Sequence, residues 1–224
     1  MALIAPSLLA ADFARLGEAL YIIEDAGASM VHVDVMDGHF VPDISVGQPV
    51  VRSVRKATGL VLDLHLLVER PERYVREFIE IGGDRIAIHA EATPNLHQVL
   101  GVIRAGGAKA GLALNPSTAV ESVSDVLEEI DYLLILSADL GFANRSFLPR
   151  TLGKVQTACD LRRDRRLSFA IQVEGCICRE NIEALVNAGA DILVAGSDIF
   201  SKDAKARLAE MIRQAAASRQ VSRV

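Results

Sequence analysis

Cysteine is scarce in this sequence of 224 residues, which contains Cys159, Cys176 and Cys178 and no others. These are too few for a disulfide framework and fit a protein from a reducing compartment. Long apolar runs are missing too, because no stretch reaches the roughly 18 apolar residues of a membrane-spanning helix. The start, MALIAPSLLAADFARL, has no basic segment before its short apolar run, unlike a secretory signal. We therefore expect a cytoplasmic enzyme.

Blocks of like charge are also missing. The formal net charge is -5, and acidic and basic residues are interspersed along the chain. Proteins that bind nucleic acid or an anionic membrane usually concentrate basic residues in one patch or segment. We therefore expect neither nucleic acid nor a membrane as a partner.

Short apolar runs alternate along the chain with stretches of helical period. Half of the residues are hydrophobic, and the length fits one α/β domain over residues 1–224. The apolar runs predict eight strands, at 3–9, 30–35, 60–68, 85–90, 108–115, 131–138, 167–175 and 191–197. The intervening stretches predict eight helices, at 12–26, 47–57, 71–81, 95–105, 119–128, 147–163, 179–188 and 198–217. Such alternation predicts a parallel sheet that is covered on both faces.

A weak internal repeat favours closure of this sheet into a barrel. DAGASMVHVD, EIGGDRIAIHA and NAGADILVAGS share a helix end, a glycine and a strand, and EEIDYLLILSA is a relative without the glycine. Successive copies lie about 50 to 60 residues apart, which is two strand-helix units. Eight such units match the size of a compact (β/α)8 TIM barrel, the fold class that we predict. An open doubly wound sheet is the main competitor, but no G-x-G-x-x-G follows the first strand.

Polar residues occur late in several predicted strands, where a barrel of this kind has its active site. His32 and Asp34 lie on the second strand, His65 on the third and Glu174 at the end of the seventh. Because residues i and i+2 of a strand face the same side, these four side chains can converge at the barrel mouth. Two imidazoles and two carboxylates suit zinc, iron(II), manganese or cobalt better than calcium or magnesium.

Neighbouring residues have two interpretations each. Asp63 is either a partner that orients His65 or a strand-start residue that faces a helix. His89, taken alone, is more often a hydrogen-bonded core residue than a metal ligand. Met36 and Leu67 fit an apolar lining over the site and ordinary core packing equally well.

Phosphate recognition in a barrel usually relies on backbone N–H groups and helix N-termini after strands seven and eight. Gly196 and Ser197 stand at the start of the last predicted helix and are candidates for this role. The loop after the sixth strand, ADLGFANRSFLP, contains Gly141 and Arg145. A guanidinium there could clamp a phosphate through two N–H groups. The alternative is an ordinary loop with a solvated arginine.

Six segments carry a resemblance that covers essentially the whole chain: IAPSLLAADFARL, HVDVMDGHFVP, LDLHLLVERPERY, KAGLALNPST, GFANRSFLP and GADILVAGSDIF. Together they resemble the ribulose-phosphate 3-epimerase family. The resemblance implies a (β/α)8 barrel that interconverts D-ribulose 5-phosphate and D-xylulose 5-phosphate by moving a proton on and off C3 with a divalent metal. It also implies that the chain forms a homo-oligomer, either a dimer or a hexamer.

Carried over by position, the resemblance implies that His32, Asp34, His65 and Glu174 bind the metal and that Asp34 and Glu174 transfer protons. Inversion next to a carbonyl requires two such carboxyl groups on opposite sides of the substrate. A metal there stabilises the enediolate charge as a Lewis acid. The residues expected to bind or cover the sugar phosphate are Ser7, Met36, Gly141, Phe142, Ala143, Asn144, Arg145, Gly175, Cys176, Gly196 and Ser197.

Two segments depart from the family's pattern and keep alternative functions open. The family usually reads V-D-G-G at the end of strand seven, whereas residues 173–176 here read V-E-G-C. Its loop after strand six usually reads N-P-G-F-G-G-Q, whereas residues 139–145 read D-L-G-F-A-N-R. Phosphate recognition could therefore be rebuilt around Arg145. The alternatives are a 3-epimerase of another ketose phosphate, such as D-allulose 6-phosphate, and a barrel that binds a sugar phosphate without turnover.

Overall fold

Eight strands and their helices account for most of the computed structural model, which describes residues 2–139, 146–201 and 203–221. The strands are β1 Leu3–Pro6, β2 Met30–Met36, β3 Val61–Leu67, β4 Arg85–His89, β5 Lys109–Leu114, β6 Tyr132–Leu136, β7 Ala170–Glu174 and β8 Ile192–Ala195. The α-helices are α1 Leu16–Asp25, α2 Gln48–Ala57, α3 Val75–Ile81, α4 Leu96–Ala105, α5 Thr151–Asp164, α6 Arg179–Ala188 and α7 Ala204–Val221. The 3-10 helices are η1 Leu8–Ala10, η2 Phe13–Arg15, η3 Pro71–Arg73, η4 Ala90–Ala92 and η5 Val120–Glu129.

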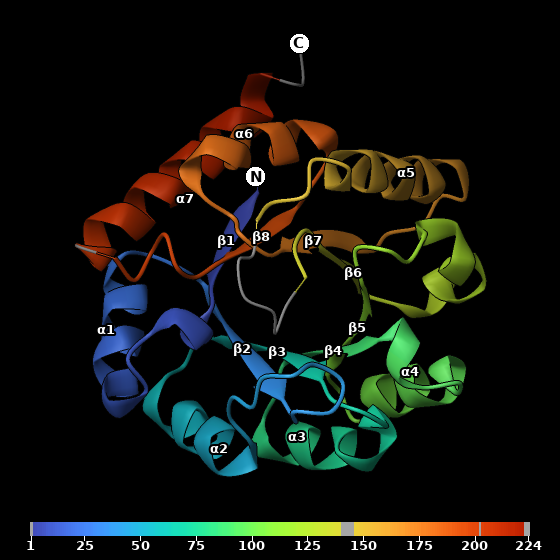
Figure 1. Ribbon diagram of the computed structural model, residues 1–224, viewed down its shortest axis with the longest axis horizontal. Helices are drawn as coiled ribbons and strands as arrows, with labels where there is room; N and C mark the ends of the chain where they lie inside the picture. The colour runs from blue at the N-terminus through green and yellow to red at the C-terminus, as the bar shows by residue number, and fades with distance from the viewer. Residues whose placement is uncertain (1, 140–145, 202, 222–224) are drawn as a thin grey trace.

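All strand pairs are parallel, and the sheet runs in the order β1-β8-β7-β6-β5-β4-β3-β2. A bridge between Ser7 and His32 joins its two edge strands and closes the barrel. Figure 1 shows the helices arranged as an outer ring around the strands. The predicted (β/α)8 fold is confirmed.

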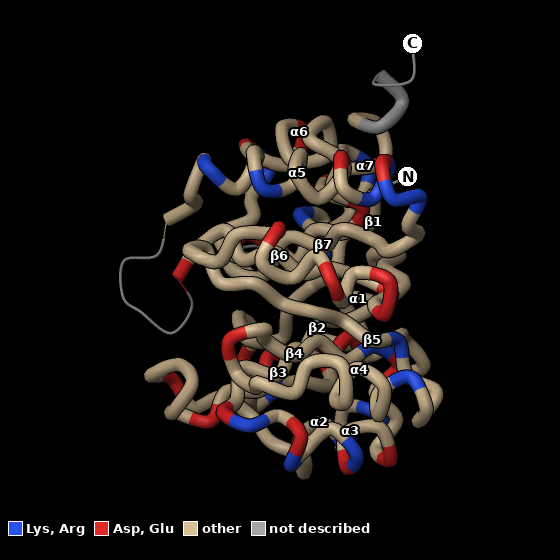
Figure 2. Tube along the Cα trace, turned by 90° about the vertical axis from the view of Figure 1, so that its right-hand side faces the viewer, with Lys and Arg blue, Asp and Glu red and all other residues tan. Residues whose placement is uncertain are grey.

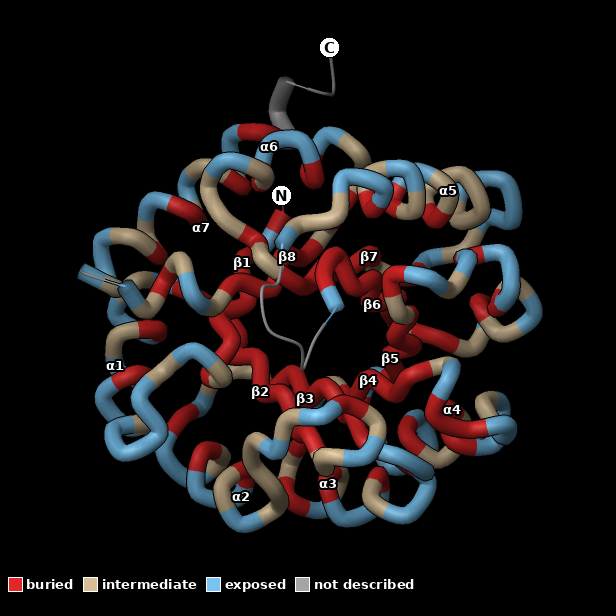
Figure 3. The backbone as a smooth tube through the Cα atoms, in the orientation of Figure 1, coloured by how far each residue is buried: buried red, intermediate tan, exposed pale blue. Residues whose placement is uncertain are grey.

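Alternation along each strand separates two environments. Val31, Val33 and Val35 of β2 belong to the large apolar core that also includes residues of the surrounding helices, whereas His32 and Asp34 face the barrel interior. The barrel wall is buried and the outer helix faces are exposed (Figure 3). Acidic and basic residues are interspersed over the helices and loops (Figure 2). Among the described helices, none has both the length and the apolar character that crossing a membrane would demand.

Several elements differ from the prediction, among them the first strand, the helix predicted at 119–128 and the last helix. The first strand ends at Pro6, because the Ser7 hydroxyl accepts a hydrogen bond from Leu9 N and caps η1. The helix predicted at 119–128 is the 3-10 helix η5, whose sequence VESVSDVLEE is rich in valine and serine, residues of low helix propensity. The last helix begins at Ala204 rather than at residue 198.

Candidate active site

Four side chains with metal-binding groups meet at the carboxyl-terminal mouth of the barrel. His32 and Asp34 come from β2, His65 from β3 and Glu174 from the end of β7. The β2–β3 register places Asp34 beside His65, so the i, i+2 pattern of one strand extends onto the next. One ligand atom of each residue lies within 4.8 Å of the others, and all four residues are buried.

The donor atoms fit a divalent cation. Oε2 of Glu174 is buried and makes no hydrogen bond of acceptable geometry with the described residues. It nevertheless lies 2.9 Å from Nδ1 of His65 and 3.3 Å from Nε2 of His32. Two nitrogens and two carboxylate oxygens aimed at one point form a set that suits a transition metal or zinc. These four residues would hold the metal.

Charge in the metal-free site is balanced by protons on the histidines. Burial lowers the pKa of His65, but Glu174 and Asp34 outweigh it and raise the pKa to about 9. For His32, burial is likewise outweighed by Asp34 and Glu174, which raise its pKa well above the usual value. Burial raises the pKa of Asp34, yet the two histidines lower it well below the normal range. A bound cation would replace these protons.

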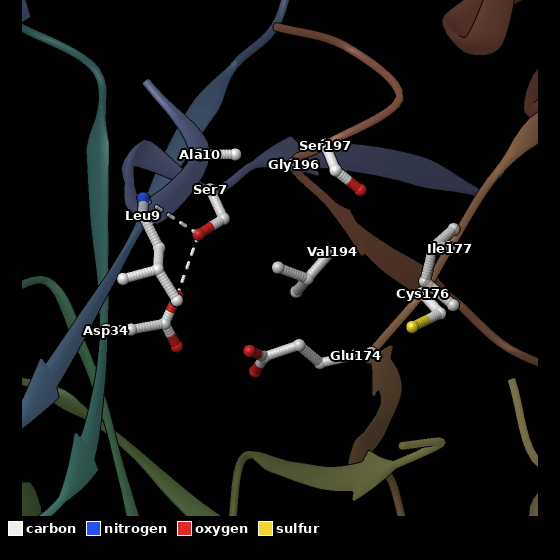
Figure 4. Close-up of a pocket in the computed structure, with 11 residues that line it drawn as sticks. Ser7, Leu9, Ala10, Asp34, Glu174, Cys176, Ile177, Val194, Gly196 and Ser197 are labelled. Carbon is white, nitrogen blue, oxygen red and sulfur yellow. Dashed lines mark hydrogen bonds between the residues drawn. The ribbon is translucent and has the colours of Figure 1, made fainter. Parts of the chain in front are cut away.

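Ser7 fixes the second oxygen of Asp34. Its hydroxyl donates a 2.7 Å hydrogen bond to Oδ2 of Asp34, whereas Oδ1 faces the histidines. The N–H group of Leu9 donates to the same Ser7 oxygen at 3.2 Å, which directs the hydroxyl hydrogen toward the carboxylate (Figure 4). Ser7 therefore stabilises the ionised form of Asp34.

Asp63 positions His32 rather than His65. Its Oδ2 lies 2.7 Å from Nδ1 of His32, and Arg85 and Gln172 hold the same carboxylate from below, at 2.9 and 2.7 Å. The proposal that Asp63 orients His65 is therefore wrong. In the parallel register, Asp63 pairs with His32, the residue directly beside it on β2, and the interior-facing side chains of the two meet. An anionic acceptor at Nδ1 leaves Nε2 of His32 facing the site.

Comparison with known proteins agrees with this geometry. A model of the ribulose-phosphate 3-epimerase family matches residues 3–200. The ribulose-phosphate 3-epimerase of Bacillus subtilis (strain 168) is 38% identical, over 94% of this chain and 97% of the relative. That of Synechocystis sp. is 43% identical, over 88% of this chain and 87% of the relative. The chain belongs to the ribulose-phosphate 3-epimerase family. It is therefore an isomerase of the carbohydrate epimerase class.

Solved structures of other enzymes share the fold. Orotidine 5'-phosphate decarboxylase from Pyrococcus horikoshii superposes with a TM-score of 0.68 over 96% of this chain and 99% of the other, at 14% identity. Thiamine phosphate pyrophosphorylase from Pyrococcus furiosus gives a TM-score of 0.65, over 97% of this chain and 96% of the other, also at 14% identity. At this identity the likeness shows the barrel alone.

A cavity of about 450 Å³ opens beside the candidate ligands of this epimerase family member. Among the predicted substrate-binding residues, its walls include Ser7, Gly175, Cys176, Gly196 and Ser197. Figure 4 shows the carboxyl groups of Asp34 and Glu174 facing each other, with Cys176 among the other residues that line the cavity.

Of the remaining predicted substrate-binding residues, the structure describes Met36, which does not line this cavity. Met36 is buried in an apolar cluster with Leu67 inside the barrel. Gly141, Phe142, Ala143, Asn144 and Arg145 lie outside the described residues. Their contact with substrate stays a prediction, as does assembly into a homo-oligomer.

The backbone after β7 uses left-handed conformations at two successive residues. Gly175 has φ +111°, and a Cβ there would lie 2.8 Å from Ala138 N, so glycine is required. Cys176 has φ +52°, a conformation that costs a non-glycine residue about 1 to 2 kcal/mol. The glycine that the family usually has at this position would avoid that cost.

His89 and Glu91 were not predicted as site residues, yet both connect to the ligand set. His89 is fully buried, and its Nε2 lies 2.9 Å from Nε2 of His65. Burial lowers the pKa of His89 to about 4. Burial raises the pKa of Glu91, but hydrogen bonds from His89 and Thr118 lower it to about 2. The sequence signal was present, because His89 ends a strand and an acidic residue follows two positions later.

Proposed function

We propose that the protein is a metal-dependent 3-epimerase that interconverts D-ribulose 5-phosphate and D-xylulose 5-phosphate. The observation that carries this proposal is the pair of carboxylates, Asp34 on β2 and Glu174 on β7, which face each other across one cavity (Figure 4). Epimerisation next to a carbonyl needs proton transfer on both faces of the substrate. Family membership supports the same chemistry, because the similar proteins compared above are named ribulose-phosphate 3-epimerases.

The cofactor in this proposal is a divalent metal, zinc, iron(II), manganese or cobalt, held by His32, Asp34, His65 and Glu174. When bound, it acts as a Lewis acid that stabilises negative charge on the substrate oxygens. Supporting this assignment, the buried Oε2 of Glu174 lacks a hydrogen-bond partner among the described residues. The ligand types leave the choice among these metals open, because availability decides it.

Proton transfer in this proposal is divided between the two carboxyl groups. Asp34 is held ionised by the Ser7 hydroxyl and the two histidines, so it accepts the C3 proton from one face. Glu174 returns a proton from the opposite wall of the barrel. In the reverse reaction the roles exchange, because each residue then stands in the protonation state that the other had.

The phosphate end of the substrate lies, in this proposal, against Gly175, Cys176, Gly196 and Ser197. These residues line the cavity on the side of β7 and β8, where barrels commonly bind phosphate. The tight packing around Gly196 supports this location, since a Cβ atom at Gly196 would lie 3.0 Å from the Cβ atom of Ala10.

Exchange of the C3 proton tests the function directly. We would incubate the protein with D-ribulose 5-phosphate in D₂O and add zinc, iron(II), manganese and cobalt in turn. Proton NMR should show deuterium at C3 and formation of D-xylulose 5-phosphate. The same assay would be run on D-allulose 6-phosphate. Exchange on this sugar and not on D-ribulose 5-phosphate would make it the substrate instead. Exchange on neither sugar with any metal would favour a barrel that binds sugar phosphate without turnover.

A further inference from the structure

The nitrogen of His65 that faces away from the ligand cluster is bonded to a second histidine. Nδ1 of His65 faces Asp34 and Glu174, at 3.3 and 2.9 Å, whereas its Nε2 lies 2.9 Å from Nε2 of His89. The two rings are stacked with centroids 5.0 Å apart and planes inclined by 26°. Both histidines are fully buried, so water does not compete for the contact.

The other ring nitrogen of His89, Nδ1, is hydrogen-bonded to a carboxylate that is itself held by several donors. Nδ1 of His89 lies 3.0 Å from Oε2 of Glu91. The other oxygen of Glu91 accepts hydrogen bonds from Asn115 N, at 2.8 Å, and from the Thr118 hydroxyl. Glu91 is thus surrounded by donors from the loop after β5, and an ionised carboxylate offers only acceptors in return.

Counting hydrogens along this chain of bonds leaves one arrangement that suits a metal site. Because Glu91 accepts, Nδ1 of His89 carries a hydrogen, and a neutral His89 then has a bare Nε2. Two nitrogens 2.9 Å apart share one hydrogen, so Nε2 of His65 must supply it. His65 is then hydrogen-bonded through Nε2 and can present the lone pair of Nδ1 to a cation.

We propose that His89 and Glu91 are positioning residues that fix the tautomer and ring orientation of His65, so that Nδ1 of His65 is the atom presented to the metal. The inference rests on the metal site proposed above and deepens it, because it adds two residues that no metal would touch. Phe40 packs on the His89 ring at 4.7 Å between centroids and restricts its rotation.

The two histidine ligands are therefore supported in different ways. His32 presents Nε2 to the site, and its Nδ1 is hydrogen-bonded to Asp63, which is paired with Arg85. His65 presents Nδ1, and its Nε2 is hydrogen-bonded to the neutral ring of His89, which is in turn hydrogen-bonded to Glu91. Opposite nitrogens face the site, yet each histidine donates its other N–H group to an acceptor. The acceptor is the Asp63 carboxylate for His32 and the bare Nε2 of the His89 ring for His65.

Zinc affinity of variants tests the proposal without turnover. We would measure zinc dissociation constants by competition with a chromophoric chelator, and record the visible spectrum of the cobalt form. His89→Leu should bind zinc about 10- to 100-fold more weakly and alter the cobalt spectrum, the usual effect of losing such a partner. His89→Gln can still accept from His65 and donate to Glu91, so it should stay within about tenfold of wild type.

The matched control is His97, which pairs with Glu129 at 2.7 Å on the surface and is remote from the cluster. His97→Leu should leave zinc affinity unchanged. If His89→Leu does not fold, Glu91→Gln tests the far end of the hydrogen-bond chain. The glutamine has one acceptor oxygen and one N–H₂ donor, so it cannot accept from His89, Asn115 and Thr118 as the carboxylate does. Wild-type affinity in His89→Leu, or equal losses in His89→Leu and His89→Gln, would overturn the proposal.

Nitrogen-15 NMR of the metal-free protein separates this proposal from the proposed function. With histidine labelled, the ring of His89 should carry its hydrogen on Nδ1 in wild type and lose that preference in Glu91→Gln. A hydrogen on Nε2 of wild-type His89 would overturn the positioning role whatever the metal does. Failure of wild type to bind zinc would instead overturn the metal site itself and leave the NMR result to decide the hydrogen-bond chain.

Discussion

Oε2 of Glu174 lies 2.9 Å from Nδ1 of His65, although the two residues belong to strands on opposite sides of the barrel. The same oxygen is 3.3 Å from Nε2 of His32 on β2. A glutamate side chain is one methylene longer than the aspartate usual in the family. In this barrel, the glutamate side chain reaches across the interior and places its carboxylate in the ligand cluster.

Shortening this side chain should weaken the site. Glu174→Asp withdraws the carboxylate by about 1 Å, and a displacement of that size lowers turnover on the order of a hundredfold. Glu174→Gln removes the proton-transferring group and should lower turnover by about 10² to 10⁴. We would measure kcat and zinc affinity for both, with the exposed Glu183→Asp as the control. Wild-type turnover in Glu174→Asp would show that the longer reach is unnecessary.

The buried pair below the site should matter for stability. Asp63→Asn leaves the largely buried Arg85 without its counter-ion, and breaking a buried pair costs about 3 to 5 kcal/mol. At roughly 2 to 4 °C per kcal/mol for a chain of this size, the Tm of the metal-free protein should fall by about 6 to 20 °C. Asp164→Asn breaks an exposed pair with Arg163 and should change stability by less than about 0.5 kcal/mol. Equal Tm values for both variants would contradict the assigned role of Asp63.

Neighbouring positions after β7 should differ in their sensitivity to substitution. Gly175→Ala places a methyl group 2.8 Å from Ala138 N in a left-handed conformation, so it should destabilise the fold by about 1 to 3 kcal/mol. Cys176→Gly relieves left-handed strain but adds unfolded-state entropy, so the two effects should offset to within about 1 kcal/mol. Urea unfolding of both variants measures this contrast. Strong destabilisation by Cys176→Gly would show that packing of the Cys176 side chain stabilises the fold.

Much of the architecture follows from sequence pattern because the barrel repeats one local rule. Apolar runs of strand length alternate with helical periods, and i, i+2 spacing put His32 and Asp34 on one face. Contacts between strands were harder to predict. The pairing of Asp63 with His32 depends on the β2–β3 register, which no local pattern specifies. The bond from His65 to His89 likewise depends on ring orientation.

The pH dependence of zinc binding follows from protons held by the metal-free site. Glu174 and Asp34 raise the pKa of His65 to about 9 against the effect of burial, so a metal must displace a proton from it at pH 7. His32, whose pKa is also raised, adds a second proton. The apparent zinc affinity should therefore rise by about one to two decades per pH unit between pH 7 and 9. Chelator competition across this range measures the slope, and His65→Gln should reduce it by one proton.

Stability of the metal-free protein should change with pH in the opposite direction. A histidine whose pKa rises from 6.5 to about 9 on folding contributes stability that is fully present below pH 6.5 and is lost as the pH rises through about 9. The Tm without metal should thus fall between pH 7 and 9, and saturating zinc should remove this fall because the cation takes the place of the protons. Thermal unfolding with and without zinc at several pH values tests both. A Tm of the metal-free protein that rises with pH over this interval would mean that Glu174 and Asp34 do not hold His65 in its charged form.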